Sequence, residues 1–595
     1  MKQRVKLIDN FSTGRKLIFF FSVLCALLST VFFSFVPQIV RVTVDSVIGT
    51  ADFDLPQILV QFLNSLGGRE FLKENLYVAG IFVLVTTTIS GIFNYLSRRN
   101  LAIASEGFIK ALRDKLFSHI GKLPLSWHLR HQTGDIIQRA TSDVETIKKF
   151  TSLQLYEMLK VVFLIIFTLF LMFSMNVQLS LLALAFLPLS ILFSYIFFGK
   201  IAKKFFETDE KEGILSSVVQ ENLTGVRVVR AFGREAYELE RFDKANSAFA
   251  EAWIRMGRTN GLYWGGEDFL TFALILTIVV ASTIFAVDGK ITTGEFIAFV
   301  SYTTALSWPV RTLGRMLVEM SKAFVSMDRI SYILEEPEEK DREEAICPPM
   351  IGDIVFQNLS FAYEADKPIL KNLNFTIKQG TTFGILGKTG AGKSTLIHLL
   401  NRLYELEGDS DISIAGTSIQ NIKLSHLRKN VGVVFGEPFL FSKSIYDNIA
   451  ISQDNFTQEQ VEEVSKIASI HDSIMEFQEG YGTVIGERGV TLSGGQKQRL
   501  AIARTLIQKT PIIIFDDSLS AVDTETDVKI RRALSENLGN ATVILISHRI
   551  TTLMEANQIL VLDKGEISAL GSHQELLAQE GIYKDIYNIQ MTEEE

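Results

Sequence analysis

Three short stretches in the second half of the chain carry residues that could handle phosphate and a metal ion. Residues 387–394, GKTGAGKS, match the pattern G-x-x-x-x-G-K-[ST] in full. Residues 491–496, TLSGGQ, form a second glycine loop. Residues 511–517, PIIIFDD, predict a buried strand that ends in two adjacent carboxylates, and a carboxylate in that position usually meets a cation. One metal ion accounts for Asp516 and leaves the role of Asp517 open.

The first glycine loop has the context that nucleotide binding requires. It follows an apolar strand predicted over 382–386 and opens a helix predicted over 394–400. The backbone N–H groups of such a loop surround phosphates, Lys393 reaches the β- and γ-phosphates, and the Ser394 hydroxyl ligates Mg²⁺. Asp516 then takes the role of the Mg²⁺ acid. The sequence therefore predicts a site for ATP and Mg²⁺, whose loop residues are Gly387, Thr389, Gly390, Ala391, Gly392, Lys393, Ser394 and Thr395.

The second glycine loop opens a helix rich in Lys, Gln and Arg, and helix N-termini with exposed N–H groups bind anions. One chain with one P-loop does not need two phosphate cradles for one ATP. We therefore expect the second cradle to serve an ATP held by another subunit. Its residues are Ser493, Gly494, Gly495 and Gln496.

The composition indicates a membrane protein with a soluble part. The 595 residues are 47% hydrophobic, with a mean hydropathy of +0.23. A net charge of −8 argues against nucleic acid as a partner, and two cysteines build neither a disulfide framework nor a zinc site. Apolar stretches of membrane-spanning length predict six helices, at approximately 17–40, 76–97, 154–175, 178–198, 262–287 and 291–312.

Basic residues set the expected orientation of these spans. They cluster after the second and fourth spans, which places those flanks, and with six spans both termini, in the cytoplasm. The two long cytoplasmic segments are expected to be helical, with turns near 131–134 and 231–234 that are either ordinary loops or contacts to another domain. Residues 1–330 thus form the predicted transmembrane domain, 331–352 an acidic linker, and 353–595 a cytoplasmic α/β domain.

With these motifs in place, nearly the whole chain resembles ABC transporters of the exporter type. LSGGQ at 492–496 is similar to the ABC signature, and IGERG at 485–489 to the exporter loop that touches the coupling helices. Tyr363 resembles the aromatic that stacks on adenine, Asp523 occupies the D-loop position, and His548 resembles the switch histidine. The resemblance implies an all-α polytopic membrane domain with six helices, followed by an α/β P-loop ABC ATPase domain, and it puts coupling helices at the two cytoplasmic turns.

Two positions depart from the family pattern. Gly436 stands where the family has a glutamine that contacts Mg²⁺ and the attacking water, and Asp517 stands where it has a glutamate as general base. The Asp side chain is one methylene shorter, and a misplaced base can cost on the order of 10²-fold in rate. Because LSGGQ is intact, the pattern resembles the degenerate-site subunit of heterodimeric bacterial multidrug exporters. His548 is also intact, which leaves weak hydrolysis open.

The expected function is export of amphiphilic compounds, drugs or lipids, across a bacterial cytoplasmic membrane, driven by ATP. The expected partners are a different ABC half-transporter with a consensus catalytic Glu, membrane lipids and the small amphiphile, but no nucleic acid. Two alternatives stay open: a homodimeric exporter that uses Asp517 as base, and an ATP-sensing membrane regulator without transport. The candidate substrate residues are Trp264, Glu267, Asp268, Tyr302 and Trp308, where the two acids either attract a cationic amphiphile or are solvated beside an aromatic anchor.

Overall fold

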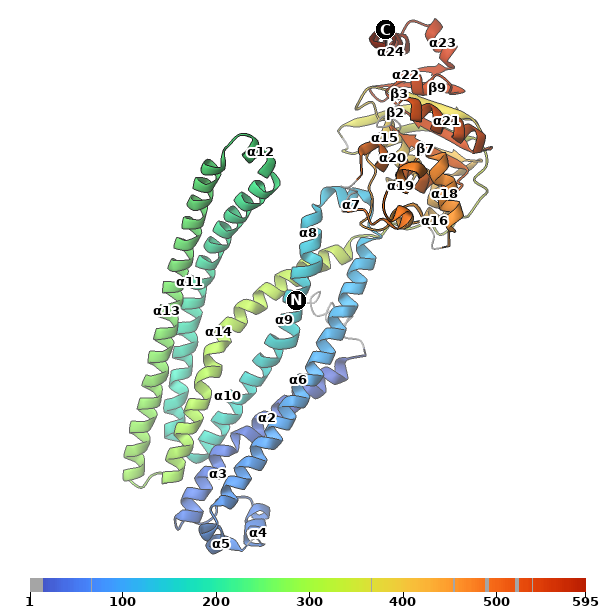
Figure 1. Ribbon diagram of the computed structural model, residues 1–595. Helices are drawn as coiled ribbons and strands as arrows, with labels where there is room; N and C mark the ends of the chain where they lie inside the picture. The colour runs from blue at the N-terminus through green and yellow to red at the C-terminus, as the bar shows by residue number, and fades with distance from the viewer. Residues whose placement is uncertain are drawn as a thin grey trace. The chain divides into compact units, whose positions relative to one another are not determined.

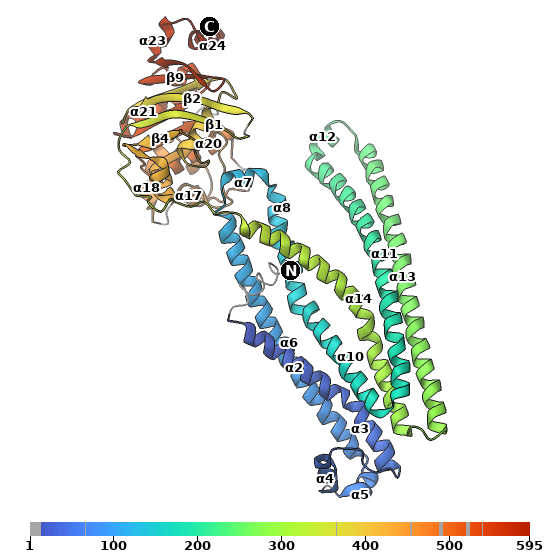
Figure 2. The ribbon, with the colours of Figure 1, turned by 180° about the vertical axis from the view of Figure 1, so that it is seen from behind.

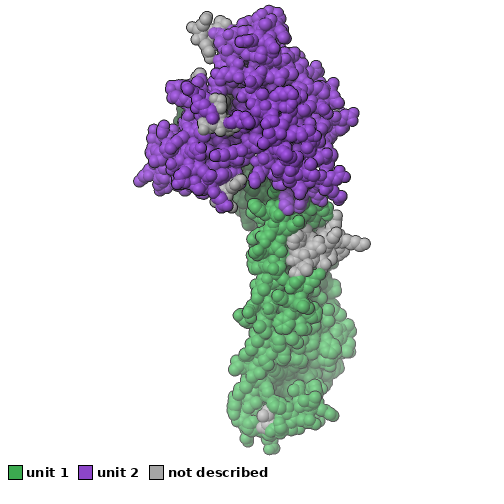
Figure 3. All heavy atoms as spheres, turned by 90° about the vertical axis from the view of Figure 1, so that its right-hand side faces the viewer, with its two compact units in different colours: residues 1–121, 132–336 green, residues 122–131, 337–595 purple. Residues whose placement is uncertain are grey.

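The structure is a computed structural model that describes residues 14–65, 67–364, 366–452, 455–486, 492–518, 524–537 and 539–594. The chain forms two compact units (Figure 3). The first comprises residues 1–121 and 132–336, and the second comprises residues 122–131 and 337–595. The second unit is therefore discontinuous in the sequence, because it takes ten residues from within the helical half.

The described part of the first unit is helical, as backbone inside a bilayer must be to satisfy its own N–H and C=O groups. Its elements, in chain order, are α2 (Lys16–Ser34), α3 (Val36–Val42), η1 (Thr43–Ile48), α4 (Gln57–Ser65), α5 (Gly68–Glu74), α6 (Tyr77–Ile120), α8 (Thr133–Gln138), η2 (Arg139–Asp143), α9 (Val144–Lys149), η3 (Phe150–Gln154), α10 (Leu155–Met175), α11 (Val177–Thr224), α12 (Val226–Ala231), α13 (Glu235–Val287) and α14 (Thr293–Glu335). Helices α11 and α13 run side by side and are joined by the short α12 (Figures 1 and 2).

Five helical stretches of the described residues are long and apolar enough to cross a membrane: Lys16–Ile48, Tyr77–Ile120, Thr133–Met175, Val177–Thr224 and Glu235–Val287. The sixth predicted span lies within α14, which is not among those five. Helices α6, α11 and α13 have 44, 48 and 53 residues, whereas about 20 residues cross the bilayer core. More than half of each helix therefore extends beyond the hydrocarbon. The turns predicted near 131–134 and 231–234 fall between α7 (Leu125–Arg130) and α8, and between α12 and α13.

Paired serines join α2 to α6. Ser22 Oγ donates to the carbonyl of Ser97 at 2.8 Å, and Ser97 Oγ donates back to the carbonyl of Ser22 at 2.7 Å. Ser29 and Ser90 make the same reciprocal pair, with both distances 2.9 Å. The pairs are seven residues apart on each helix, which is two turns and hence the same face. Small hydroxyl side chains let two membrane helices approach closely and hydrogen-bond across the seam.

A second seam joins η1 to the start of α14. The Asp45 carboxylate accepts from the backbone N–H of Gly294 at 2.7 Å and from Thr292 Oγ1 at 2.5 Å. A Cβ at position 294 would lie 2.5 Å from the carbonyl oxygen of Arg41 and 2.5 Å from Asp45 Oδ2, so only glycine allows this approach. Arg41 pairs with Asp54 at 2.8 Å and lies 3.7 Å from Glu295. This contact, the Asp45 clasp, ties the first and last membrane helices together.

The second unit contains two sheets. The strands are β1 (Ile354–Ala362), β2 (Pro368–Ile377), β3 (Thr382–Gly387), β4 (Asp411–Ile414), β5 (Thr417–Ser418), β6 (Val431–Val434), β7 (Ile512–Asp516), β8 (Thr542–Ile546), β9 (Gln558–Asp563) and β10 (Glu566–Gly571). One sheet has the order β2-β1-β4-β5 and is antiparallel, and the other has the order β10-β9-β3-β8-β7-β6. Strands β9, β3, β8, β7 and β6 are parallel neighbours. In open α/β sheets ligands bind beyond the carboxyl ends of such strands.

Helices pack on this sheet and on one another. They are α15 (Lys393–Leu400), α16 (Leu424–Asn430), α17 (Ile445–Ile449), α18 (Gln458–Ile467), α19 (His471–Met475), α20 (Gly494–Leu506), α21 (Thr524–Asn537), α22 (Ile550–Leu553), α23 (His573–Ala578) and α24 (Ile582–Glu594). Two apolar cores flank the sheet, and the inward side chains of β3 and β7 alternate between them. The α/β class predicted for this half is confirmed.

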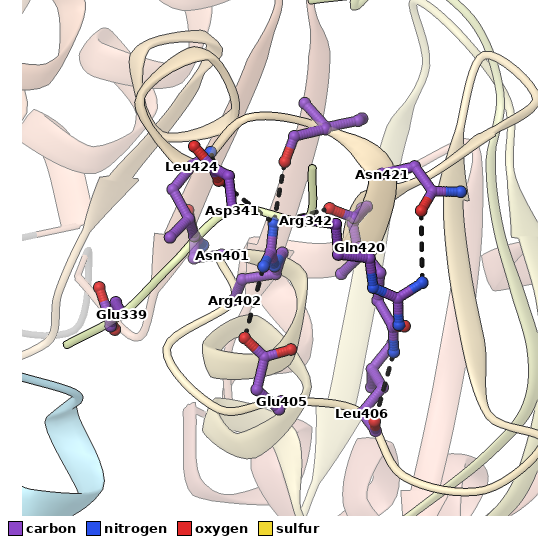
Figure 4. A network of polar contacts seen from close by, with 12 residues as sticks. Glu339, Asp341, Arg342, Asn401, Arg402, Glu405, Leu406, Gln420, Asn421 and Leu424 are labelled. Carbon is purple, nitrogen blue, oxygen red and sulfur yellow. Dashed lines mark hydrogen bonds and ion pairs between the residues drawn. The ribbon is translucent and has the colours of Figure 1, made fainter. Parts of the chain in front are cut away.

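Most of the predicted acidic linker makes contacts with other residues of the second unit. Helix α14 continues to Glu335, and the residues that follow bind the second unit (Figure 4). Glu339 accepts two hydrogen bonds from Arg428, at 2.8 and 3.2 Å. Asp341 accepts from the backbone N–H of Leu424 at 2.7 Å and lies 3.9 Å from the buried guanidinium of Arg402. The backbone N–H of Glu339 also donates to the carbonyl of Lys122 at 2.8 Å. Residues 337–352 of the predicted linker therefore belong to the second unit, whereas residues 331–335 are the end of α14.

Candidate nucleotide-binding site

The P-loop joins β3 to α15, as the sequence pattern requires. Gly390 and Gly392 have φ values of 85° and 102°, in the left-handed region that favours glycine. A Cβ at Gly392 would lie 2.5 Å from a side-chain carbon of Leu370, so the loop packs tightly on β2. Lys393 Nζ donates to the carbonyl of Gly387 at 2.7 Å and to that of Lys388 at 3.1 Å. The ammonium thus lies over its own loop, where a phosphate group would meet it.

The residues of the P-loop differ in their exposure to solvent, and burial affects the pKa of Lys393. Burial lowers the pKa of Lys393, and the nearby carboxylates of Asp517 and Asp516 oppose that shift. Thr389 and Gly390 are exposed, whereas Ala391, Gly392 and Thr395 are buried. The loop therefore presents its tip to solvent and anchors its base in the core.

Ser394 and Asp516 are brought together across the carboxyl ends of β3 and β7. Ser394 Oγ donates to Asp516 Oδ1 at 3.3 Å. Burial raises the pKa of the Asp516 carboxyl, and the Ser394 hydrogen bond opposes the shift. A hydroxyl and a carboxylate are oxygen ligands of the kind that Mg²⁺ takes, with water and phosphate oxygens completing the shell. No group of three or more His, Cys, Asp or Glu with metal-binding geometry occurs among the described residues.

Asp517 and His548 meet at the same edge of the sheet. His548 Nδ1 lies 3.0 Å from Asp517 Oδ1 and 3.2 Å from Oδ2. Asp517 has a left-handed backbone with φ of 50°, and its N–H donates to the carbonyl of Ile546 at 3.0 Å. A Cβ at Gly436 would lie 3.0 Å from the Asp516 carbonyl and 3.8 Å from the Asp517 Cβ. Gly436 and Asp517, the two departures from the family pattern, are therefore neighbours in space although they are 81 residues apart in the sequence.

Tyr363 lies just beyond β1, and its hydroxyl donates to Thr395 Oγ1 at 3.1 Å. The same oxygen is 3.5 Å from His398 Nδ1. Burial lowers the pKa of His398, which favours the neutral imidazole. Phe361 and Tyr404 both pack edge-on against the Tyr363 ring, at centroid distances of 5.0 Å. The sequence analysis missed these supporting residues, because no motif marks them.

The second glycine loop caps α20. Ser493 Oγ accepts from the backbone N–H of Gln496 at 3.3 Å, and Gln496 Oε1 accepts from the backbone N–H of Ser493 at 2.9 Å. Ser493 and Gly494 are exposed, and a Cβ at Gly494 would meet no atom within 4 Å. Within the described residues, no hydrogen bond or ion pair joins this loop to residues 387–395. Asp523 and residues 487–489 of IGERG lie outside the described residues.

Three of the candidate substrate residues, Glu267, Asp268 and Tyr302, are bonded to other residues of the helical unit. Glu267 is fully buried and accepts from Ser190 Oγ at 2.9 Å and Ser194 Oγ at 2.7 Å. Asp268 pairs with Arg311 at 2.5 Å. Tyr302 is 1% exposed and donates to the carbonyl of Ser34 at 2.8 Å.

The two candidate tryptophans are arranged differently. Trp264 stacks on Trp308 with centroids 6.1 Å apart. Trp308 is 63% exposed and lines a cavity of about 720 Å³ between α10 and α14. The charged residues Glu157, Lys160 and Glu319 also line this cavity. Sequence analysis did not single them out, since they come from distant parts of the chain and match no motif.

Comparison with known proteins identifies the family of both halves of the chain. The model of the ABC transporter transmembrane region matches residues 19–310, and the ABC transporter model matches residues 370–520. The ABC transporter ATP-binding protein YknU of Bacillus subtilis is 33% identical over 96% of this chain and 95% of its own length. A B. subtilis ATP-binding/permease protein named for multidrug export, YgaD, is 34% identical over 80% of this chain and 83% of its own. The ATP-dependent lipid A-core flippase of Syntrophus aciditrophicus is 32% identical over 86% of this chain and 85% of its own.

A solved structure extends the match to three dimensions. A bacterial Atm1-family ABC exporter with ATP bound has a TM-score of 0.81 and 26% identity, covering 97% of this chain and 99% of that one. The match spans both the helical domain and the ATPase domain, and its helices agree with roughly six spans. The chain belongs to the ABC transporter family, as an exporter-type half-transporter with a helical transmembrane domain fused to one ATPase domain.

Proposed function

We propose that this chain is the degenerate-site half of a heterodimeric ABC exporter. The observation that carries the proposal is the adjacency of Gly436 and Asp517 beside the candidate Mg²⁺ residue Asp516. Position 436 has no side chain to hold Mg²⁺ or water, and the carboxylate at 517 is one methylene short of the family's base. Both losses fall on the ATP held by this chain's own P-loop, so hydrolysis there is slow.

The second ATP site is completed in trans. Ser493 and Gly494 are exposed at the N-terminus of a 13-residue helix and, within the described residues, bond to nothing in the P-loop. An exposed helix N-terminus attracts phosphate. In the proposed dimer these residues, with Gln496 and Asp523, face the ATP on a partner chain that carries a consensus Glu. Hydrolysis there resets the cycle, and ATP at the slow site acts as an interface ligand that biases the inward–outward equilibrium.

A homodimeric exporter is the second candidate, and the Asp517–His548 contact favours it. The imidazole holds the shorter carboxylate in one orientation, and an oriented Asp still accepts a proton from water, though from a less favourable distance. The heterodimer nevertheless accounts for Gly436 as well as Asp517, whereas the homodimer accounts for Asp517 alone.

The transported molecules are amphiphilic drugs or lipids, moved outward across a bacterial cytoplasmic membrane. Support comes from relatives that are named for multidrug export and for lipid A-core flipping. In this proposal six spans place both termini in the cytoplasm, with Lys73 outside and Lys110 and Lys203 inside. Single-cysteine variants that lack Cys25 and Cys347 test this arrangement, and labelling of position 203 by an impermeant reagent from outside intact cells would refute it.

The decisive experiment is purification of the tagged chain from its native membrane, identification of any companion chain, and assay of two variants in that assembly. Asp517→Asn removes a base that is already poor, so ATP turnover should fall only a few-fold. Gly494→Asp puts a negative charge against the partner's γ-phosphate, so most turnover should be lost. If Asp517→Asn abolishes turnover in an assembly that contains this chain alone, the homodimer is correct.

A further inference from the structure

The open cavity between α10 and α14 has the size and lining of a site for one organic molecule. Its volume of about 720 Å³ lies within the range of about 300–1,000 Å³ typical of small-molecule pockets. Leu164 and Trp308 supply apolar surface, while Glu157, Lys160 and Glu319 supply charge. Lys160 and Leu164 are four residues apart on α10, so charge and apolar surface share one face of that helix.

The two acids of the cavity already have cationic partners. Glu157 Oε1 lies 3.5 Å from a guanidinium nitrogen of Arg98. Glu319 Oε1 lies 3.0 Å from Lys322 Nζ, and its other oxygen is 3.5 Å from Gln154 Nε2. A cationic ligand would therefore compete with Arg98 for Glu157 and with Lys322 for Glu319.

Lys160 is in the opposite situation. It is half-buried on the first turns of α10, and it makes no ion pair or hydrogen bond within the part of the chain that the structure describes. A lysine within a membrane-spanning stretch normally pairs or extends to the membrane interface, because an unpaired charge near hydrocarbon is costly. Its charge is therefore the one left uncompensated in this cavity.

We propose that the cavity binds an anionic amphiphile, with its carboxylate, sulfonate or phosphate group on Lys160 and its apolar body against Leu164 and Trp308. Trp308 is well suited to this role, since it is 63% exposed yet fixed by stacking on Trp264. The inference rests on the proposed export function and gives the substrate class. It reverses the charge preference that Glu267 and Asp268 suggested, since both of those acids are bonded within the helical unit.

Binding to the full chain with its companion tests the site without reference to transport. The probes are two fluorescent amphiphiles with one shared aromatic body, one ending in a sulfonate and the other in a trimethylammonium group. Lys160→Gln should weaken binding of the sulfonate probe by about tenfold and should not weaken binding of the ammonium probe, because the substitution removes a charge of the same sign. Lys160→Arg should retain sulfonate binding, and Trp308→Ala should weaken both probes.

Lys110→Gln is the matched control, because Lys110 is exposed on α6 and pairs with Asp114. It should change the affinity of neither probe. Equal effects of Lys160→Gln on both probes, or no effect on either, would overturn the inference. ATP-dependent transport of the same probes in vesicles is measured separately. A parent assembly that binds the sulfonate probe but moves no amphiphile would refute the export function and leave the binding site standing.

Discussion

The imidazole of His548 and the carboxylate of Asp517 face each other from the ends of β8 and β7, with Nδ1 3.0 Å from Oδ1. The contact keeps the shorter acid pointed toward the histidine although its backbone is left-handed, a conformation that Asp tolerates better than most residues. If Asp517 is the base, as proposed, this contact fixes its orientation while the shorter side chain reduces its reach.

Asp517→Glu should raise ATP turnover at this chain's own site several-fold, because the added methylene extends the carboxylate toward the attacking water. The upper bound is the factor of about 10² that misplacement of a base can cost. Release of inorganic phosphate is measured in the assembly with its companion, with the companion's base removed to silence the other site. Because φ is 50° at position 517, the longer side chain also costs about 1–2 kcal/mol of local strain. A fall in turnover without a fall in thermal stability would contradict the assignment of Asp517 as the base.

Tyr363→Ala should weaken ATP binding by about 1–3 kcal/mol if adenine stacks on the ring. The ring is held in place by edge contacts with Phe361 and Tyr404 and by the hydroxyl bond to Thr395. Tyr363→Phe is the control, since it keeps the stacking surface and removes only that bond. Affinities are compared with a fluorescent ATP analogue, and equal binding by the Ala and wild-type chains would exclude adenine from this position.

As the pH is lowered, the affinity for Mg²⁺ at this chain's site should begin to fall at a higher pH than it would with an Asp of ordinary pKa. Burial raises the pKa of the Asp516 carboxyl, so protonation on acidification begins above the usual value of about 3.9. The protonated carboxyl does not ligate the ion, so Mg²⁺ affinity is full well above the raised pKa and is lost as pH drops through it. Mg²⁺ titrations of the nucleotide-loaded protein at a series of pH values measure the effect. The Asp516→Asn variant should bind Mg²⁺ weakly, with an affinity that does not change over the same pH range. A parallel decline of affinity in that variant would assign the effect to another group.

Gly294→Ala should destabilise the transmembrane domain by about 1–3 kcal/mol, as expected when a methyl group is forced into packed surroundings. The added Cβ would overlap the Arg41 carbonyl and the Asp45 carboxylate, and the Asp45 clasp would have to open. The readout is the thermal midpoint in lipid nanodiscs. Gly257→Ala on α13 is the matched control, because a Cβ there meets nothing within 4 Å and helix propensity alone favours Ala. Equal midpoints for the two variants would show that the clasp is not under steric constraint.

The sequence predicted the parts of the site that depend on local pattern. The strand before Gly387 and the helix after Lys393 follow from their glycine loop, and parallel pairing of β3, β8 and β7 then brings Ser394 to Asp516 without further information. Other contacts depend on surroundings that no local pattern encodes. Glu339 lies in a charge-rich stretch typical of a solvated linker, yet it meets Arg428, 89 residues away.

The same limit applies to the membrane half. Glu267 and Asp268 suggested either a charged substrate site or solvated acids, because they lie at the edge of a predicted span, but their serine and arginine partners come from other helices. Lys160 drew no notice, because one lysine at the start of an apolar run resembles an interfacial anchor. Lys160 has no acidic partner among the described residues, because Glu157 and Glu319 pair with other cations. Only the packing of the helices shows this pairing.

The discontinuity of the second unit limits how this chain could be recombined with its relatives. A gene fusion at residue 353, where the composition changes, would take Glu339 and Asp341 from the other parent. Arg428 would then lose its acid, and Arg402 would keep Glu405 but lose Asp341. It would also separate the ATPase domain from residues 122–131, whose Leu123 and Trp127 are buried. A domain exchange that keeps all of these contacts would therefore move two separate stretches of the gene, those for residues 122–131 and 337–595.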